Sequence, residues 1–156
     1  MPLLKFPFTL TIAGTGEPEY IKALKAMITD DNIAAKINWF GFVDEEKFDL
    51  ISHHHLLILP SHDENFGNVV IESLSVGTPV LISNKVGLAG YVTGKKLGWV
   101  CKAEKNDLSD TLNQIEPGFN GELERIRETA PQLIRQDFNT DILIQQYIAF
   151  YKTLTE

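Results

Sequence analysis

Residues 56–83 constrain the fold of this chain more than any other stretch of its sequence. They begin with a short apolar run, continue through a polar segment that carries acids, and then show apolar residues at helical spacing. The Gly-Thr-Pro sequence at 77–79 ends the helical pattern, and a second apolar run follows it. The pattern predicts a strand at 56–59, a loop at 61–65, a helix at 66–76 and a strand at 80–82.

The rest of the sequence continues this alternation of short apolar strands and helices. Such alternation indicates βαβ units, a parallel sheet and right-handed crossovers. We expect a Rossmann-like or flavodoxin-like three-layer α/β sandwich, whose five-stranded parallel sheet has the order 2-1-3-4-5 and carries helices on both faces. Further strands are predicted at 8–13, 37–42 and 98–101, helices at 18–29, 45–53 and 106–115, a short helix or turn at 86–93, two or three helices interrupted at Pro131, and a last helix at 141–154.

Length and composition limit the class of protein. The 156 residues suit a single domain with a sizeable core, and a net charge of -7 argues against a nucleic-acid partner. A local basic patch stays open as an alternative. The longest apolar run falls well short of the roughly 20 residues that a membrane span needs, and the N-terminus does not resemble a signal peptide. The single Cys101 fits a cytoplasmic protein, and we expect it to be a packed apolar residue.

The predicted strand order points to two loops as the ligand site. In open parallel sheets, ligands bind beyond the carboxyl ends of the strands, where the strand order reverses. With the order 2-1-3-4-5, this position lies between the first and third strands. The loops there are residues 14–16 and residues 61–68.

The Gly14-Thr15-Gly16 loop is only partly like a dinucleotide-binding fingerprint. Its third glycine is missing, because position 19 is Glu, and Glu17 adds a second negative charge near the place of a pyrophosphate. Close passage of the backbone to a ligand, or simply a tight turn, is the favoured interpretation.

The second loop, residues 61–68, leads into the helix inside the constraining stretch. The unpaired N–H groups of the first helical turn make an anion site that suits a diphosphate, and Gly67 lets a ligand approach closely. The alternative is that Asp63 or Asn65 caps the helix and that nothing binds.

Two glutamates, Glu64 in the loop and Glu72 in the helix, favour a ligand. A carboxylate accepts hydrogen bonds from vicinal hydroxyls, so that two carboxylates on one rim can hold two sugar rings. The spacing of slightly over two helical turns places Glu72 about 10 Å deeper along the same broad side. The alternative is an exposed Glu72 on an amphipathic helix, which its apolar neighbours disfavour.

At this point the sequence resembles a known family, the group 1 retaining glycosyltransferases of the GT-B fold, in their C-terminal, donor-binding domain. The resemblance covers roughly residues 8–101. It implies that residues 1–156 form a single domain that binds a nucleotide-diphospho-sugar, with no metal or other cofactor. The matching segments are LTIAGTGEPEY, INWFGFVDEE, LLILPSHDENFGNVVIESLSVGTPVLIS, the following VGL, and LGWVC.

The resemblance also implies roles for individual residues. Glu64 would be the catalytic-site carboxylate that contacts hydroxyls of the transferred sugar, and Glu72 would bind the ribose hydroxyls. The backbone N–H groups of Phe66, Gly67 and Asn68 would face the sugar and the diphosphate. The other substrate contacts would be Gly14, Gly16, Phe42 and Val43 beside the nucleotide, and Ser61, His62 and Asn65 in the loop.

The sequence departs from the family pattern in two respects. In the family, an Arg and a Lys that neutralise the donor diphosphate lie on a strand and a helix before LTIAG, and the acceptor-binding domain precedes them. This chain contains neither these cations nor that domain, and Lys5 stands in a different context. The missing strand is central in the family order 3-2-1-4-5-6, so the order 2-1-3-4-5 requires the sheet to close over the gap. In addition, an acid that the family often carries after Gly87 is replaced by Leu88-Ala89-Gly90.

These departures indicate part of an enzyme, either truncated or one piece of a split protein. We expect the chain alone to transfer little sugar. The acceptor, a sugar or a lipid, would bind through the missing domain, which could also associate the protein with a membrane. Apolar residues of the last helix would be left exposed and would favour a dimer; they are Phe150, Tyr151 and Leu154.

Other classes of function stay open. The run His53-His54-His55 is a poor metal site, because adjacent helical residues point about 100° apart. A non-catalytic flavodoxin-like module that binds nucleotides or proteins would show an exposed Glu72 and a shallow cleft. A nucleotide-sugar epimerase of the same two-domain shape is a third possibility, and the two-glutamate motif with its Gly-Thr-Pro turn favours the transferase.

Overall fold

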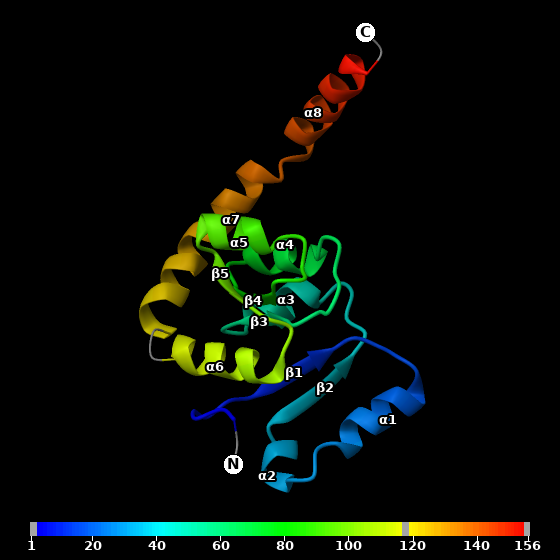
Figure 1. Ribbon diagram of the computed structural model, residues 1–156, viewed down its shortest axis with the longest axis vertical. Coiled ribbons are helices and arrows are strands. Elements are labelled where there is room, and N and C mark those ends of the chain that lie inside the picture. The colour runs from blue at the N-terminus through cyan, green and yellow to red at the C-terminus, as the bar shows by residue number, and fades with distance from the viewer. Residues whose placement is uncertain (1–2, 117–118, 155–156) are drawn as a thin grey trace. The chain divides into compact units, whose positions relative to one another are not determined.

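Figure 1 shows a computed structural model of the chain, which describes residues 3–116 and 119–154. The chain divides into two compact units, Met1–Lys47 and Phe48–Glu156.

The first unit is a parallel pair of strands with two helices. Strand β1 (Leu10–Ala13) pairs with β2 (Ile37–Gly41), and the register shifts by one residue after Ile12. Helix α1 (Pro18–Ala26) follows β1, with Pro18 at its first turn, where a missing N–H costs nothing. The short helix α2 (Asp31–Ala34) was not predicted; Asp30 caps it by accepting the Asn32 N–H at 2.9 Å.

The second unit has a three-stranded parallel sheet in the order β3-β4-β5. Its elements are α3 (Lys47–Ser52), β3 (Leu57–Leu59), α4 (Asn68–Ser75), β4 (Val80–Ser83), α5 (Ala89–Lys95), β5 (Gly98–Cys101), α6 (Lys105–Ile115), a π-helix (Phe119–Leu123), α7 (Glu124–Asp137) and α8 (Thr140–Thr153). Among the described residues, no helix is both long enough and apolar enough to span a bilayer.

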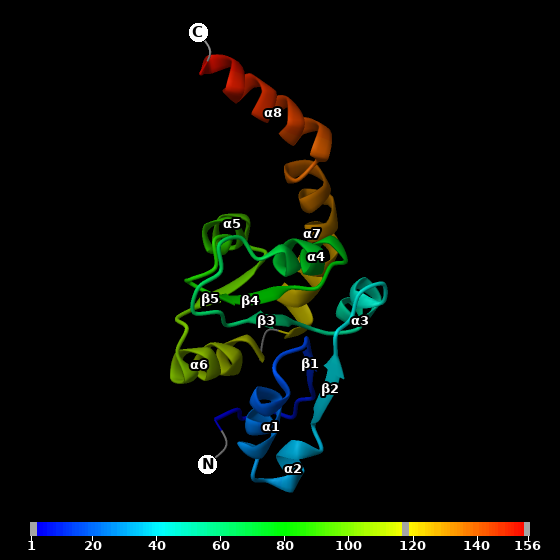
Figure 2. The same ribbon diagram turned by 90° about the vertical axis from the view of Figure 1, so that its right-hand side faces the viewer.

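Strand β4 lies at the centre of this sheet and is completely buried. Its alternate residues Val80 and Ile82 share one hydrophobic core with buried side chains of α4, α5 and α7. Figure 2 shows α4 and α5 over one face of the sheet and α6 over the other. The parallel α/β architecture with helices on both faces is therefore confirmed for this unit.

The prediction of a single five-stranded sheet is wrong. The strands form two sheets: β1 pairs with β2, whereas β3 pairs with β4. A parallel ladder needs its next strand about 4.8 Å away. No ladder joins β1 to β3 among the described residues, so the order 2-1-3-4-5 is not formed.

The Gly-Thr-Pro turn between α4 and β4 is built by buried hydrogen bonds. The Thr78 hydroxyl donates to the Ile51 carbonyl in α3 at 2.9 Å, and the Ser73 hydroxyl donates to the Thr78 carbonyl at 2.8 Å. Gly77 has a φ of 84°, in the region that favours glycine. This turn therefore has a structural role, since it joins α3, α4 and β4.

The predicted interruption at Pro131 is also wrong, because α7 runs through it. A proline inside a helix leaves the carbonyl four residues earlier, here that of Arg127, without its usual donor. That carbonyl lies against Gly77, where a Cβ atom would be only 2.8 Å from its oxygen. The α4–β4 turn thus packs closely against the helix at the point where proline has removed a hydrogen bond.

Candidate functional site

The 61–68 loop is joined by its backbone to the segment that follows β4. Glu64 and Val86 form a parallel bridge, in which the Glu64 N–H donates to the Lys85 carbonyl at 3.2 Å. The Gly87 N–H donates to the Glu64 carbonyl at 2.8 Å. The backbone of Glu64 is therefore held in place, while its carboxylate is half-buried at the carboxyl ends of β3 and β4.

Ser61 is a second point of attachment for the loop. The Ser83 hydroxyl, at the end of β4, donates to the Ser61 carbonyl and also accepts the Lys85 N–H at 3.2 Å. Ser61 thus contributes its backbone carbonyl to the architecture of the site. Its own hydroxyl takes no part in these two bonds.

Glycines allow the two segments to approach closely. A Cβ atom on Gly87 would lie 2.0 Å from the Asn65 carbonyl oxygen, which no real side chain can tolerate. Gly67 is buried with a φ of 85°, and a Cβ there would lie 3.1 Å from Val86 Cγ1. Both positions therefore require glycine for the loop to keep this path.

Helix α4 begins directly after this loop, with Gly67 at its N-cap position and no side chain capping it. The alternative in which Asp63 or Asn65 caps the helix is therefore not observed. The N–H groups of an uncapped first turn point out of the helix and carry its positive partial charge. This end of α4 can receive an anion.

The predicted site residues of the second unit lie in the 61–68 loop and in α4. Glu64 and Glu72 are both half-buried, so Glu72 lacks the full exposure expected of a non-catalytic module. The loop side chains that are exposed to solvent are His62, Asp63, Asn65, Phe66 and Asn68.

Lys85 is a candidate that the sequence analysis missed. Its carbonyl is bonded to Glu64, and its side chain is exposed beside the loop. The available signal was its position just after β4, since residues at the carboxyl ends of parallel strands gather at the ligand-binding edge.

An aromatic and ionic cluster contacts the loop from α5 and the end of α7. The Phe138 ring meets Phe66 edge-on at 6.2 Å between centroids, and meets Tyr91 at 5.1 Å. The Tyr91 hydroxyl donates to Asp137 Oδ2 at 3.0 Å, and Lys95 Nζ lies 2.7 Å from the same oxygen. The bonds from Lys95 and then Tyr91 hold the pKa of Asp137 below its usual value, whereas burial and the bond to Asp137 raise the pKa of Tyr91.

The other predicted site residues, Gly14, Gly16, Phe42 and Val43, belong to the first unit. The Gly14 N–H donates to the Gly41 carbonyl at 2.6 Å, so that the carboxyl ends of β1 and β2 lie side by side. Phe42 is 72% exposed and lines a hollow of about 380 Å³. The hollow also contains Phe40, Val43, Asp44, Glu45 and Glu46.

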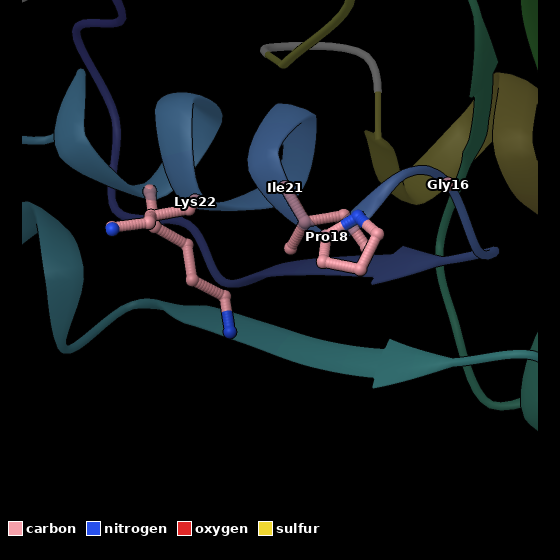
Figure 3. Close-up of a pocket in the computed structure, with 5 residues that line it drawn as sticks. Gly16, Pro18, Ile21 and Lys22 are labelled. Atoms are coloured by element: carbon pink, nitrogen blue, oxygen red, sulfur yellow. The ribbon is translucent and has the colours of Figure 1, made fainter.

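Gly16 lines a separate hollow of about 420 Å³ beside α1. Figure 3 shows Pro18, Ile21 and Lys22 around it. Lys25 completes the lining, and its ammonium lies 5.1 Å from the centroid of the Trp39 ring. The cations here contrast with the three acids of the hollow at Phe42, which make that one a poor place for phosphate.

The histidine run and the cysteine have structural contacts. The Nδ1 atoms of His53 and His54 lie 2.8 Å and 2.7 Å from carbonyls of their own helix, those of Asp49 and Leu50. Cys101 is 4% exposed, and burial, reinforced by the Asp107 carboxylate, raises the pKa of its thiol. The expectation of a packed Cys101 is confirmed.

Comparison with known proteins connects this geometry to a family. The family model described as glycosyl transferases group 1 matches residues 2–132. The capsular polysaccharide biosynthesis glycosyltransferase CapM of Staphylococcus aureus is 28% identical over 101 residues, which are 64% of this chain and 26% of that protein. An uncharacterized glycosyltransferase of Methanocaldococcus jannaschii is 25% identical over 150 residues, 94% of this chain and 37% of its own length.

Solved structures show the same fold. Anabaena HepE in complex with UDP superimposes with a TM-score of 0.80 at 22% identity, over 94% of this chain and 41% of that one. Sucrose-phosphate synthase from Thermosynechococcus elongatus gives a TM-score of 0.78 at 21% identity, over 94% and 38%. The chain thus spans between a quarter and two fifths of the length of these relatives. Because the family model covers most of its sequence, the chain belongs to the group 1 glycosyltransferases and corresponds to the C-terminal, Rossmann-like portion of the GT-B fold.

Proposed function

We propose that this chain binds the nucleotide-diphospho-sugar donor of a retaining glycosyltransferase at the start of α4. The observation that carries the proposal is the uncapped N-terminus of α4, reached by a loop whose backbone is bonded to the segment after β4 while most of its polar side chains face solvent. Further support comes from HepE, which has been solved with UDP and with UDP-glucose.

The diphosphate would lie against the first turn of α4. Gly67 lets the loop pack against Val86 and begin the helix, and the N–H groups of Gly67 and Asn68 would supply donors that need no reorganisation. As the bond to the sugar breaks, negative charge builds on the departing diphosphate, and fixed donors at that point stabilise the transition state. This electrostatic role requires no metal ion.

The two carboxylates would orient the sugars on either side of the diphosphate. Glu64 would accept hydrogen bonds from hydroxyls of the transferred sugar, and Glu72 from the ribose. The backbone bonds of Glu64 hold its Cα in place, so that its carboxylate is positioned before the donor arrives. His62, Ser61 and Asn65 would complete the loop contacts.

Transfer itself would need more than this chain. The acceptor would attack from the face on which the diphosphate leaves, which gives retention. We expect the chain alone to hydrolyse or transfer little donor, because it spans only between a quarter and two fifths of the length of its relatives. Sustained sugar transfer by the 156-residue chain would overturn that expectation.

Calorimetric titration tests the proposal. The chain is titrated with UDP, GDP, ADP and UDP-glucose, and the binding ligand is then tested against Glu72→Ala and against Glu128→Ala, an exposed control on α7. Loss of hydrogen bonds to a charged group, about 1.5–3 kcal/mol, corresponds to roughly ten- to hundredfold weaker binding for Glu72→Ala and no change for the control. Absence of binding by every nucleotide would favour the non-catalytic module.

A further inference from the structure

The 61–68 loop is held on two sides, and the second side comes from a distant part of the chain. Its backbone is bonded to the segment after β4 through Glu64. From the other direction, the ring of Phe138 lies edge-on against the ring of Phe66, 6.2 Å away. We infer that Phe138 is a positioning residue for this loop: by holding Phe66 it sets the direction of the backbone N–H groups of Gly67 and Asn68. The inference rests on the proposed function, because those groups are the ones assigned to the diphosphate.

Phe138 is itself well anchored. Its N–H donates to the Ile134 carbonyl at 2.9 Å as the C-cap of α7, and its ring packs against the hydrophobic core. Tyr91 meets that ring at 5.1 Å. The neighbouring Asp137 accepts the Tyr91 hydroxyl and pairs with Lys95, which joins this end of α7 to α5. Phe138 therefore provides a fixed surface against which the Phe66 side chain packs.

Phe66 is the more exposed partner of the pair. It is 43% exposed, so burial of apolar area is not what this contact chiefly provides. Edge-to-face geometry between aromatic rings has an orientation preference of its own. Phe66 directly precedes Gly67, which is in a left-handed conformation with a φ of 85°. A change in the backbone angles of Phe66 therefore changes the direction of the N–H groups of Gly67 and Asn68, which are the first donors of α4.

The test uses the full chain and four variants. Phe138→Leu removes the ring but keeps apolar bulk, and Phe138→Tyr keeps the ring as the conservative rescue. Leu133→Ala is the matched control, because Leu133 is half-buried on the same helix and packs on the same core. Phe66→Leu removes the same ring contact by changing the exposed partner, so the hydrophobic core is unchanged. This variant still tests the inference if Phe138→Leu fails to fold.

Two readouts separate positioning from stability. Hydrogen exchange of the backbone amides at 66–68 is expected to accelerate in Phe138→Leu and Phe66→Leu, and to stay at the wild-type rate in Leu133→Ala and Phe138→Tyr. UDP affinity is expected to fall about two- to twelvefold in Phe138→Leu, which corresponds to the usual interaction energy of an aromatic pair. In Phe138→Tyr we expect the wild-type affinity.

A double-mutant cycle then tests whether Phe138 acts on UDP binding through Phe66. If Phe138 acts through Phe66, the double Leu variant binds UDP no more weakly than either single variant. Additive losses, or equal effects of Phe138→Leu and Leu133→Ala on both readouts, would overturn the inference. If the wild-type chain binds none of UDP, GDP, ADP and UDP-glucose, the proposed function fails, and the exchange rates alone decide whether Phe138 positions the loop.

Discussion

Gly87→Ala is the sharpest perturbation of the proposed site, because it adds one methyl group at the point where two backbone segments meet. The new Cβ would lie 2.0 Å from the Asn65 carbonyl oxygen and 2.9 Å from its carbonyl carbon. Both atoms belong to the backbone of the 61–68 loop, so a side-chain rotation cannot relieve the clash. The loop and the segment after β4 must move apart.

The size of the effect follows from this movement. Ordinary contact between such atoms is about 3.5 Å, so the segments must separate by roughly 1.5 Å. That separation breaks the hydrogen bonds between Glu64 and its neighbours Lys85 and Gly87, which measure 3.2 Å and 2.8 Å. Each of the two bonds is worth about 0.5–1.5 kcal/mol and overpacking costs about 1–3 kcal/mol, which gives a destabilisation of about 2–6 kcal/mol.

Denaturant unfolding followed by circular dichroism measures this loss. Gly90→Ala is the matched control, since it lies three residues away in α5 and its Cβ would meet nothing within 4 Å. We expect the control to keep or slightly raise the free energy of unfolding, because alanine is the better helix former. An unchanged free energy of unfolding in Gly87→Ala would refute the close contact between the two segments.

Three further predictions concern other parts of the second unit. Gly77→Ala should lower the free energy of unfolding by about 2–4 kcal/mol in the same assay, because it combines left-handed strain with a Cβ 2.8 Å from the Arg127 carbonyl; a loss below about 0.5 kcal/mol would contradict this packing. Cys101, with its buried thiol, should react with a disulfide reagent at least about tenfold more slowly in the native chain than in denaturant, and equal rates would show that it is accessible. The exposed apolar face of α8 should cause concentration-dependent association in light scattering, which the Ile148→Glu/Tyr151→Glu variant abolishes; a wild-type monomer at all concentrations would exclude that dimer.

Local patterns predicted the elements of the second unit well. Strands β3, β4 and β5 were found within one residue at either end, because short apolar runs bounded by proline, glycine or polar residues leave few alternatives. Helix α2 was missed, since its four residues carry no apolar periodicity and only the Asp30 cap marks it. The break expected at Pro131 was wrong because α7 continues through the proline, where the turn at Gly77 packs closely against the Arg127 carbonyl.

Pairing between distant strands was harder to predict. The order 2-1-3-4-5 required β1 to pair with β3, and nothing local in either strand tests that pairing. Parallel strands are joined through long connections, so their pairing depends on which neighbours the whole chain can supply. Local sequence therefore predicted the strands and their parallel direction, but not the division into two sheets.

In the candidate site, too, local features could be predicted from the sequence, whereas contacts between distant residues could not. The two glutamates, the start of the helix and Gly67 were all visible in one stretch of sequence, whereas the absence of a side-chain cap became clear only from the structure. The bonds that hold Glu64 are backbone bonds to Lys85 and Gly87, which do not depend on side-chain identity and leave no pattern. Phe138 lies more than seventy residues from Phe66, and only the folded chain brings the two rings together.

The central claim is that a nucleotide-diphospho-sugar binds at the start of α4. The most direct test is an NMR titration of the isotope-labelled chain with UDP-glucose, following the backbone amide signals of Glu64, Gly67, Asn68 and Glu72. We predict saturable shifts that are largest at Gly67 and Asn68, because their N–H groups would donate to the diphosphate. Saturable shifts that leave these two amides unchanged, or no shifts at all, would contradict the claim.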